Sequence, residues 1–518
     1  MTVPETNFPN PPKPVGPAPA RSELRPPDLR GDLHILRSEL SAAQAAFDEG
    51  RAAEAGDLLQ RLMPRIESAS SRYARLGSAD LAAVRLLGAA ALALQGDVSC
   101  ALGDADAGQA ALTQAIAEFE EWLPRAGRRT SQALAAYALA LEAAGRHENA
   151  VGALEQAVAQ GSVSAPAYLL LARHRQAQGD LDAAAELCRQ SLDVAPDSLD
   201  AQQTLAEILE AQGQTADALV NYHRTVNLLA AAGRGDDALA VAEHILALAP
   251  DDIDGLVVYG ELLRLRGEPE KALAALDHAL ALDPTNREAL AKRGAVLITL
   301  GRTEEALASL DAALTFDPKS AWALSVKGDA LRLLGRNKEA LAVLEEALAL
   351  GEDDAWTLDT LAQVLLALGR GAEAVTVLRR AAEAYPQLAW VQAELAAALR
   401  EAGQLDEALA AADRAWAVDP GDPELLKLRI DILQRLPRFE DALKALDDVL
   451  AQNADDANAL WLRGDTLRQM GQYEDALAAL DRALALAPAN AQCLGSRGLV
   501  LRALGEDRKA AGALLKAA

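Results

Sequence analysis

Residues 287–320 read REALAKRGAVLITLGRTEEALASLDAALTFDPKS, and this stretch decides the fold. In its first half, Leu290, Gly294 and Leu297 stand at i, i+4 and i+7, which is the spacing of one face of an α-helix. Gly301 follows at a point where a glycine in the left-handed conformation would end that helix. We therefore predict a first helix that ends just before Gly301.

The second half of the stretch has the same spacing. Ala306, Leu310 and Ala313 lie on one face of a second helix, and Pro318 ends it because the residue before a proline is pushed out of the helical region. Gly294 and Ala306 are both small, so the backbones of the two helices can approach closely. The stretch as a whole predicts a helix–turn–helix hairpin.

The hairpin recurs with a period of 34 residues. When residue 287 is counted as position 1, alanine holds position 20 in eight successive units: Ala272, Ala306, Ala340, Ala374, Ala408, Ala442, Ala476 and Ala510. A fixed period of this length indicates a repeat architecture, in which stacked units bury a continuous core. We expect an all-α solenoid.

Position for position, the unit resembles the tetratricopeptide repeat, which has a small residue at position 8, alanine at 20 and 27, and proline at 32. The chain departs from this pattern at position 24, where leucine replaces an aromatic residue. It also departs at position 7, an edge that we expect to be solvated, with Arg293, Lys327, Arg463 and Arg497. The resemblance implies a right-handed α-solenoid whose first helices line a concave groove for a peptide or protein.

The repeat frame predicts the organisation of the chain. Ala218 and Ala238 are 20 residues apart instead of 34, so one odd helix is expected between two sub-arrays. An early loop is expected at 96–107. The predicted segments are a proline-rich tail at 1–30, degenerate helical repeats at 31–130, a repeat sub-array at 131–232, a joint at 233–252 and a regular array at 253–518 whose last repeat is truncated.

Two positions depart from the frame. Pro437 replaces the glycine of position 15, and we expect it to fit the first turn of the following helix. The last unit stops at Ala518 without the polar cap that solenoids usually have. This end predicts either self-association through the uncapped helices or a longer natural protein.

Charge and composition narrow the partners. The net charge of −26 opposes general binding to nucleic acid or to an anionic membrane surface, and it permits basic partners. There is no apolar run of about 18 residues, so no membrane span is expected. The three cysteines have no paired spacing, which suits a reducing compartment and predicts a cytoplasmic location.

The sequence offers no catalytic motif. It has no phosphate loop, no zinc-protease helix motif, no nucleophile elbow and no C-x-x-C pair. The six histidines are scattered over different units and show no metal-ligand spacing. We therefore expect no enzyme activity, no cofactor and no metal site.

Tryptophans provide the first candidate binding residues. Trp322, Trp356 and Trp390 hold position 2 of three successive units, and Trp461 holds position 5 of a later one. In the family's arrangement these positions face the groove, where tryptophan is a favoured anchor. The alternative is that each indole packs against the loop of a neighbouring unit.

Arginines at position 12 provide the second set. Arg332 and Arg468 each have an acid three residues earlier, Asp329 and Asp465, so an i, i+3 ion pair is expected for both. Arg400 lacks such an acid and is expected to be free to meet a carboxylate of a partner.

The main functional hypothesis is a scaffold that binds a protein or peptide in the groove. The alternative is the sensor or targeting half of a larger effector enzyme whose catalytic domain lies beyond residue 518.

Overall fold

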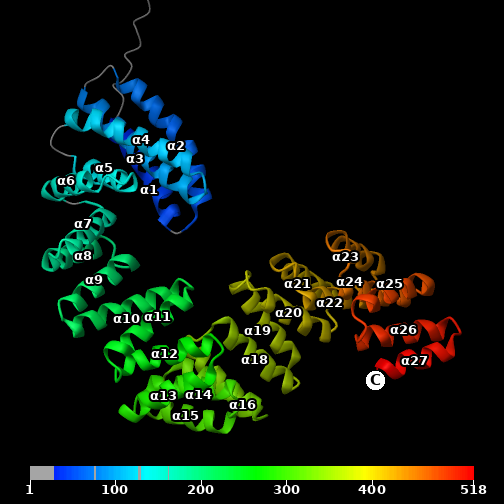
Figure 1. Ribbon diagram of the computed structural model, residues 1–518. Coiled ribbons are helices and arrows are strands. Elements are labelled where there is room, and N and C mark those ends of the chain that lie inside the picture. Colours follow the sequence, from blue (N-terminus) through cyan, green and yellow to red (C-terminus); the bar gives the residue numbers. More distant parts are fainter. Residues whose placement is uncertain (1–28, 49, 75–77, 127–129, 162, 518) are drawn as a thin grey trace, which may run out of the picture. The chain divides into compact units, whose positions relative to one another are not determined.

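The computed structural model describes residues 29–48, 50–74, 78–126, 130–161 and 163–517. In these residues all regular structure is helical, as the repeat pattern predicts. The chain divides into two compact units, Met1–Leu248 and Ala249–Ala518, each built from consecutive antiparallel helices (Figure 1). Most of the predicted tail lies outside the described residues, and the first helix already begins at Leu29.

The first unit holds eleven α-helices and a short 3-10 turn, Leu123–Arg125, among its described residues. The helices are α1 (Leu29–Asp48), α2 (Ala52–Tyr73), α3 (Ser78–Ala101), α4 (Ala105–Trp122), α5 (Ser131–Ala143), α6 (His147–Ala159), α7 (Ala165–Ala177), α8 (Leu181–Val194), α9 (Leu199–Ala211), α10 (Thr215–Ala231) and α11 (Gly235–Leu248). Three helices, α9 to α11, thus fill the region where the sequence predicts an odd helix.

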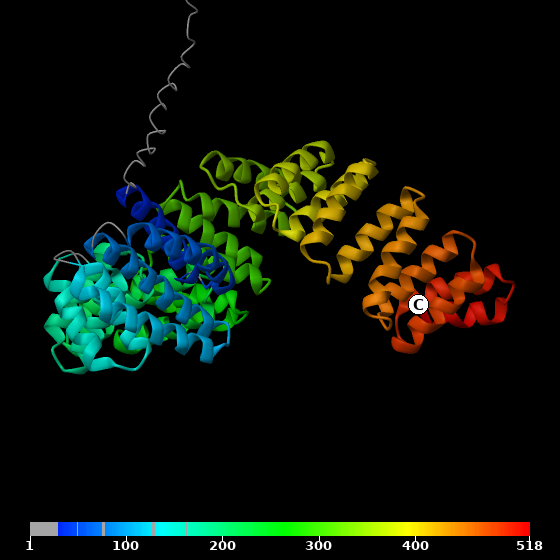
Figure 2. The same ribbon diagram turned by 90° about the horizontal axis from the view of Figure 1, so that it is seen from above.

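The second unit consists of eight hairpins (Figures 1 and 2). Their helices are α12 (Ile253–Leu265), α13 (Pro269–Leu282), α14 (Arg287–Thr299), α15 (Thr303–Phe316), α16 (Ala321–Leu333), α17 (Asn337–Ala349), α18 (Ala355–Ala367), α19 (Gly371–Ala384), α20 (Ala389–Glu401), α21 (Leu405–Val418), α22 (Pro423–Arg435), α23 (Phe439–Gln452), α24 (Ala457–Gln469), α25 (Tyr473–Leu486), α26 (Ala491–Ala503) and α27 (Asp507–Ala517). Even-numbered helices are the first helices of each hairpin, and odd-numbered ones are the second.

Glycine at position 15 ends the first helices, as predicted. Gly301 has a φ of 72°, a left-handed conformation that glycine adopts without steric cost. The next amide, of Arg302, donates to the carbonyl of Leu297 at 2.8 Å, so one of the last free carbonyls of α14 is satisfied. The turn therefore closes each hairpin without a long loop.

Small residues at position 8 bring the two helices of a hairpin together. A Cβ placed on Gly294 would lie 2.6 Å from Cγ of Leu310, and one on Gly328 would lie 2.5 Å from Cγ of Leu344. Leucine at position 24 thus fills the space that the missing side chain leaves.

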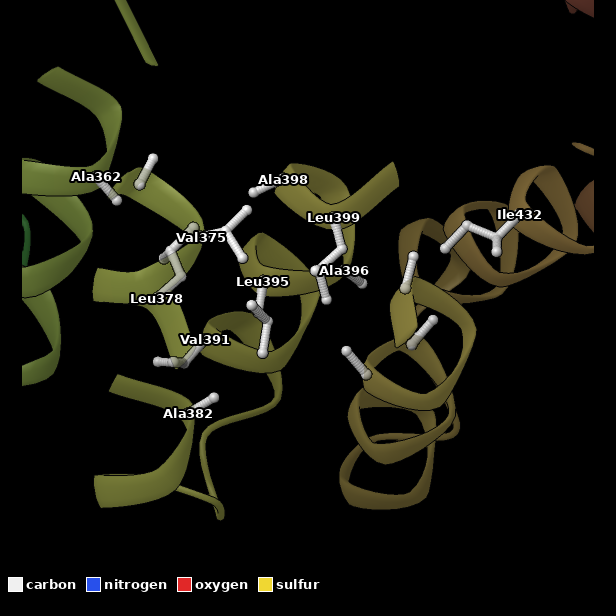
Figure 3. Close-up of a cluster of buried hydrophobic side chains, with 14 of the residues drawn as sticks. Ala362, Val375, Leu378, Ala382, Val391, Leu395, Ala396, Ala398, Leu399 and Ile432 are labelled. Atoms are coloured by element: carbon white, nitrogen blue, oxygen red, sulfur yellow. The ribbon is translucent and has the colours of Figure 1, made fainter. Parts of the chain in front are cut away.

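The largest core cluster described runs through the middle of the second unit. Val375 and Leu378 of α19 face Val391 and Leu395 of α20, and all four side chains are buried (Figure 3). Burying a side chain of this size contributes about 1.5–3 kcal/mol. Because every hairpin adds its apolar stripe to the same layer, the core continues from one repeat to the next.

The basic residues at position 7 are paired, which corrects the expectation of a merely solvated edge. Arg293 Nε lies 2.6 Å from Oδ1 of Asp277 in the preceding unit, and Lys327 Nζ lies 2.6 Å from Oδ1 of Asp311. The same pair, sixteen residues apart, recurs three more times: Arg429–Asp413, Arg463–Asp447 and Arg497–Asp481. These pairs join consecutive repeats.

The expected loop at 96–107 is wrong. α3 continues to Ala101 and the turn is confined to residues 102–104. Gly96 lies inside α3, and glycine is needed there because a Cβ would lie only 2.7 Å from Cγ of Leu112 on α4. In the same way, a Cβ on Gly108 would lie 2.8 Å from the carbonyl oxygen of Gly96. These glycines serve close helix contact and do not break the helix.

α3 also contains an apolar segment, Leu81–Ala101, that meets the length and composition of a membrane span. In the described chain it is the one helix segment that does so, and 56% of its most apolar stretch is buried inside the protein. It packs against α2 and α4, and a buried core helix meets the same criterion.

The hairpin of α22 and α23 differs from the others of the second unit. Its position 8 holds Ile430, which is fully buried, where the other hairpins have glycine or alanine. Pro437 does not enter the first turn of α23, as was expected from the sequence. It lies in the turn before α23, where the other hairpins of the second unit have a left-handed glycine. Proline has no amide hydrogen, so the hydrogen bond that Gly301 donates to the carbonyl of Ile298 at 2.9 Å has no counterpart in this turn.

We expect Pro437→Gly to raise the stability of the second unit. The added freedom of glycine in the unfolded chain costs about 1 kcal/mol, but the left-handed conformation and the amide hydrogen bond that proline cannot supply outweigh it, for a net gain of about 1 kcal/mol. Urea unfolding followed by circular dichroism measures the change. Pro423→Gly is the control and should lower stability, because Pro423 stands at the first position of α22, where proline is favourable. A lower urea midpoint for Pro437→Gly would show that this turn does not require a left-handed residue.

Candidate partner-binding groove

The first helices of the second unit form an inner layer. Each contacts the first helix of the next repeat, from α14 with α16 through α18 with α20 to α24 with α26. Second helices pack against their own first helix and against that of the next unit. We call this succession of first helices the inner layer, and the family pattern predicts that their positions 2, 5, 9 and 12 line a groove.

Two of the four predicted tryptophans are exposed on this layer. Trp356, in the first turn of α18, is 40% exposed, and Trp390, in the first turn of α20, is 42% exposed. Asp354 caps α18 by accepting from the amide of Trp356 at 2.8 Å, which fixes the backbone that carries this indole. An exposed indole on an ordered backbone is a suitable apolar anchor for a ligand.

The other two tryptophans are half-buried and packed. Trp322 contacts the core cluster of α14 and α16, and Lys292 Nζ lies 5.5 Å from the centre of its ring. Trp461 packs against the core on both sides of α24 and donates from Nε1 to Oγ of Ser496 at 3.3 Å. The packing alternative thus describes these two indoles better than a continuous ladder of exposed rings does.

The predicted i, i+3 ion pairs are present. Arg332 donates from both Nε and Nη2 to Oδ1 of Asp329, at 3.0 and 2.7 Å, and Arg468 Nε lies 2.9 Å from Oδ1 of Asp465. Burial pushes the pKa of Asp465 upward, but hydrogen bonds from Arg468, Gln469 and Ser496 outweigh burial and hold this pKa below its ordinary value. Both arginines are therefore held in place by their own helix.

The expectation that Arg400 is free is wrong. Its Nη1 lies 3.0 Å from Oδ2 of Asp431, on the first helix of the next repeat, and its Nη2 lies 3.0 Å from Oε1 of Glu401. The sequence search considered only acids three residues earlier on the same helix. An acid 31 residues later is one repeat away and becomes a neighbour only when the helices stack.

Arg400, Trp461 and Asp465 border one hollow of about 450 Å³ on the inner layer. Its wall comes from three successive first helices, α20, α22 and α24, and it includes Lys427 and Asp431. The lining mixes both signs of charge with an indole edge. A hollow of this size can hold one side chain of a bound segment. It also brings together Arg400, Trp461 and Asp465, which the sequence located only by their positions in the repeat.

Two groove residues were missed from the sequence. Asp359 holds position 5 of α18 and Glu394 holds position 6 of α20, each a few residues after an exposed tryptophan. Asp359 is only 9% exposed, and burial raises its pKa to about 6, with a further rise from the charge of Glu394. For Asp359 the available signal was a carboxylate at position 5 of a first helix, three residues after a tryptophan. Glu394, at position 6, gave no such signal.

The described residues show no grouping of side chains for metal binding. Burial raises the pKa of Cys188 and of Cys493 to about 11, so both thiols stay protonated near neutral pH and act as packing groups.

Stacked hairpins, left-handed glycines between their helices and an inner layer of first helices define an α-solenoid of helix–turn–helix repeats. Sequence models described as tetratricopeptide repeat match residues 175–220, 229–296, 263–330, 319–387, 365–432, 399–465 and 457–490. The chain belongs to the tetratricopeptide repeat family, whose members are typically scaffolds for protein or peptide partners without catalysis of their own. A search of curated proteins finds no match.

Solved structures with similar helices include three that differ in how much of this chain they cover. A Pseudomonas aeruginosa structure described as pilF is 22% identical, covers 40% of this chain and 94% of its own, and has a TM-score of 0.35. The Cut9–Hcn1 hetero-tetramer of APC/C is 15% identical, covers 94% of this chain and 93% of its own, and has a TM-score of 0.36. YrrB, described as having an unusual peptide-binding site, is 23% identical, covers 43% of this chain and 97% of its own, and has a TM-score of 0.29. At such identities and scores these likenesses carry no argument about function.

Proposed function

We propose that the chain is a scaffold that holds an extended peptide or a protein segment against the inner layer of its second unit. The observation that carries the proposal is the pair of exposed indoles, Trp356 and Trp390, at the same position of two neighbouring first helices. Large apolar side chains exposed next to each other are typical of interaction surfaces. The hollow beside Arg400 and Trp461 would take a further side chain of the same partner.

The wider setting stays a prediction. Three free cysteines are in keeping with a cytoplasmic location, and the net charge of −26 disfavours nucleic acid and anionic membranes as partners. Self-association is a separate possibility to measure, since Leu515 of α27 is 81% exposed. The sensor half of a larger effector remains the alternative, and the natural gene beyond codon 518 decides it.

The double variant Trp356→Ala/Trp390→Ala should lose partner capture while keeping its fold. Anchors of this kind contribute about 2 kcal/mol or more each, so the affinity for a partner should fall about a thousandfold where the two contributions add. Helicity and melting temperature should stay close to those of the parent, because at 40% and 42% exposure neither indole belongs to the core cluster of this region. Affinity capture with quantitative mass spectrometry, beside circular dichroism, measures both.

Phe316→Ala is the matched control. Phe316 is an aromatic side chain of similar exposure, 49%, but it stands at the end of a second helix, away from the inner layer. Its loss should leave capture unchanged. Equal retention by the double variant and the parent would refute the groove as the binding surface, and unfolding of the double variant would show that the indoles are structural.

A further inference from the structure

The inner layer contains a buried carboxylate that is only half satisfied. Oδ2 of Asp359 accepts from Nε2 of Gln363 at 2.6 Å, whereas Oδ1 is buried and has no hydrogen-bond partner in the described chain. With 9% exposure, this side chain is more than nine-tenths buried. A buried carboxylate oxygen without a donor costs about 1–3 kcal/mol or more, so the site is incomplete as it stands.

No arginine of the inner layer completes this site. Arg332, one repeat earlier, is committed to Asp329, and Arg400, one repeat later, is committed to Asp431. The charges that act on Asp359 are those of Glu394 and Asp329, which raise its pKa, and of Arg332, which lowers it. Glu394 forms no ion pair that the described structure shows, and loss of hydration beside the groove raises its pKa although its side chain is exposed. Two carboxylates thus stand without a cation.

The exposed indoles stand beside these carboxylates. Trp356 precedes Asp359 by three residues on α18, and Trp390 precedes Glu394 by four residues on α20, which are spacings that put side chains on one helix face. The face of an indole attracts a cation as well as an apolar group. Neighbouring first helices therefore present the same combination twice, an indole followed by an acid.

We propose that Asp359 and Glu394, bordered by Trp356 and Trp390, bind the arginine or lysine side chain of a basic, extended segment of the partner. The inference rests on the proposed function and adds the charge of the ligand to it. A guanidinium or ammonium group would donate to Glu394 and, once the side chains that cover it move aside, to the buried Oδ1 of Asp359, in charge-assisted hydrogen bonds. The net charge of −26 favours the encounter with a basic segment.

The test uses the full chain and pools of nine-residue peptides. All positions are random except the central one, which is arginine, lysine, glutamine or glutamate in four separate labelled pools. At low salt we expect the arginine and lysine pools to bind at least about tenfold more than the other two, measured by fluorescence anisotropy. Asp359→Asn and Glu394→Gln should each remove most of that preference.

Glu346→Gln is the matched control, since it removes one negative charge from an exposed site on the second helix α17. It should keep the preference. Equal binding of the arginine and glutamine pools, or an equal loss in Glu346→Gln, would overturn the inference. If Trp356→Ala/Trp390→Ala abolishes binding of all pools while Asp359→Asn changes none, the proposed groove is supported and the proposed cation site is refuted. If neither variant changes binding, both proposals are refuted.

A metal ion is the other cation to test. Calorimetric titration of the parent chain with CaCl₂ alone should give no heat that depends on Asp359. Heat that disappears in Asp359→Asn would identify an inorganic cation as the ligand and would also overturn the inference.

Discussion

Gly328→Val should lower the free energy of unfolding of the second unit by about 3 kcal/mol. A Cβ at this position would lie 2.5 Å from both Cγ and Cδ2 of Leu344, and valine adds two further methyl groups in the same space. Overpacking of this kind costs about 1–3 kcal/mol, and the better helix propensity of valine over glycine returns only a few tenths. Leu344 is fully buried and has little room to move.

Urea unfolding of the whole chain, with hydrogen exchange to locate the change in α16 and α17, measures the effect. Gly495→Val is the matched control, because Gly495 also lies in a first helix but nothing stands within 4 Å of its would-be Cβ. It should be neutral. Adding Leu344→Ala to Gly328→Val should destabilise by less than the sum of the two single changes, since each relieves the other. Additive losses would refute the close contact.

Asp359→Asn should raise the stability of the second unit at pH 7.5 by about 2 kcal/mol and leave it unchanged near pH 4. Burial raises the pKa of Asp359 to about 6, above the value of about 4 in an unfolded chain. As pH rises from 4 to 6, the unfolded chain therefore ionises first, and the folded state loses stability relative to it. Asparagine has a similar shape and cannot ionise, so the loss disappears.

The urea midpoint as a function of pH, compared between the variant and the parent, isolates this group from others that titrate nearby. Asp465→Asn is the contrasting control, because hydrogen bonds hold the pKa of Asp465 below its ordinary value. Its loss should destabilise at neutral pH, and the difference should shrink as pH falls below about 4. A pH-independent effect of Asp359→Asn would mean that its carboxylate is well solvated. If Asp359→Asn raises the free energy of unfolding, the carboxylate of Asp359 costs stability, as expected for a residue that is kept for binding.

The fold could be predicted from the sequence because its determinants are local and repeated. Gly301 and Leu310 act within one hairpin, and a 34-residue period copies their effect along the chain. Irregular positions were harder. The start of α23 after Pro437 and the long helix through Gly96 depend on how two helices meet, which a residue pattern does not state.

The groove could be predicted only in part. Position 2 identified Trp356 and Trp390, but the same position in an earlier unit holds Trp322, which packs against the core. Arg400 was misjudged because its partner, Asp431, belongs to the next repeat. Asp359 was missed because its importance comes from burial and from an unpaired oxygen, and neither is visible in the sequence.

The recurring pairs between position 7 and the preceding unit bear on how the array comes apart. Between the hairpins of the second unit, two boundaries lack them: there position 7 holds Leu361 and Leu395, both buried, in the repeats that carry Trp356 and Trp390. In a linear array, cooperativity depends on the coupling between neighbours, and exposed ionic coupling weakens with salt whereas apolar coupling does not. Rising ionic strength should therefore weaken the coupling of the outer repeats by up to about 1 kcal/mol per boundary, and affect less the two boundaries beside the exposed indoles.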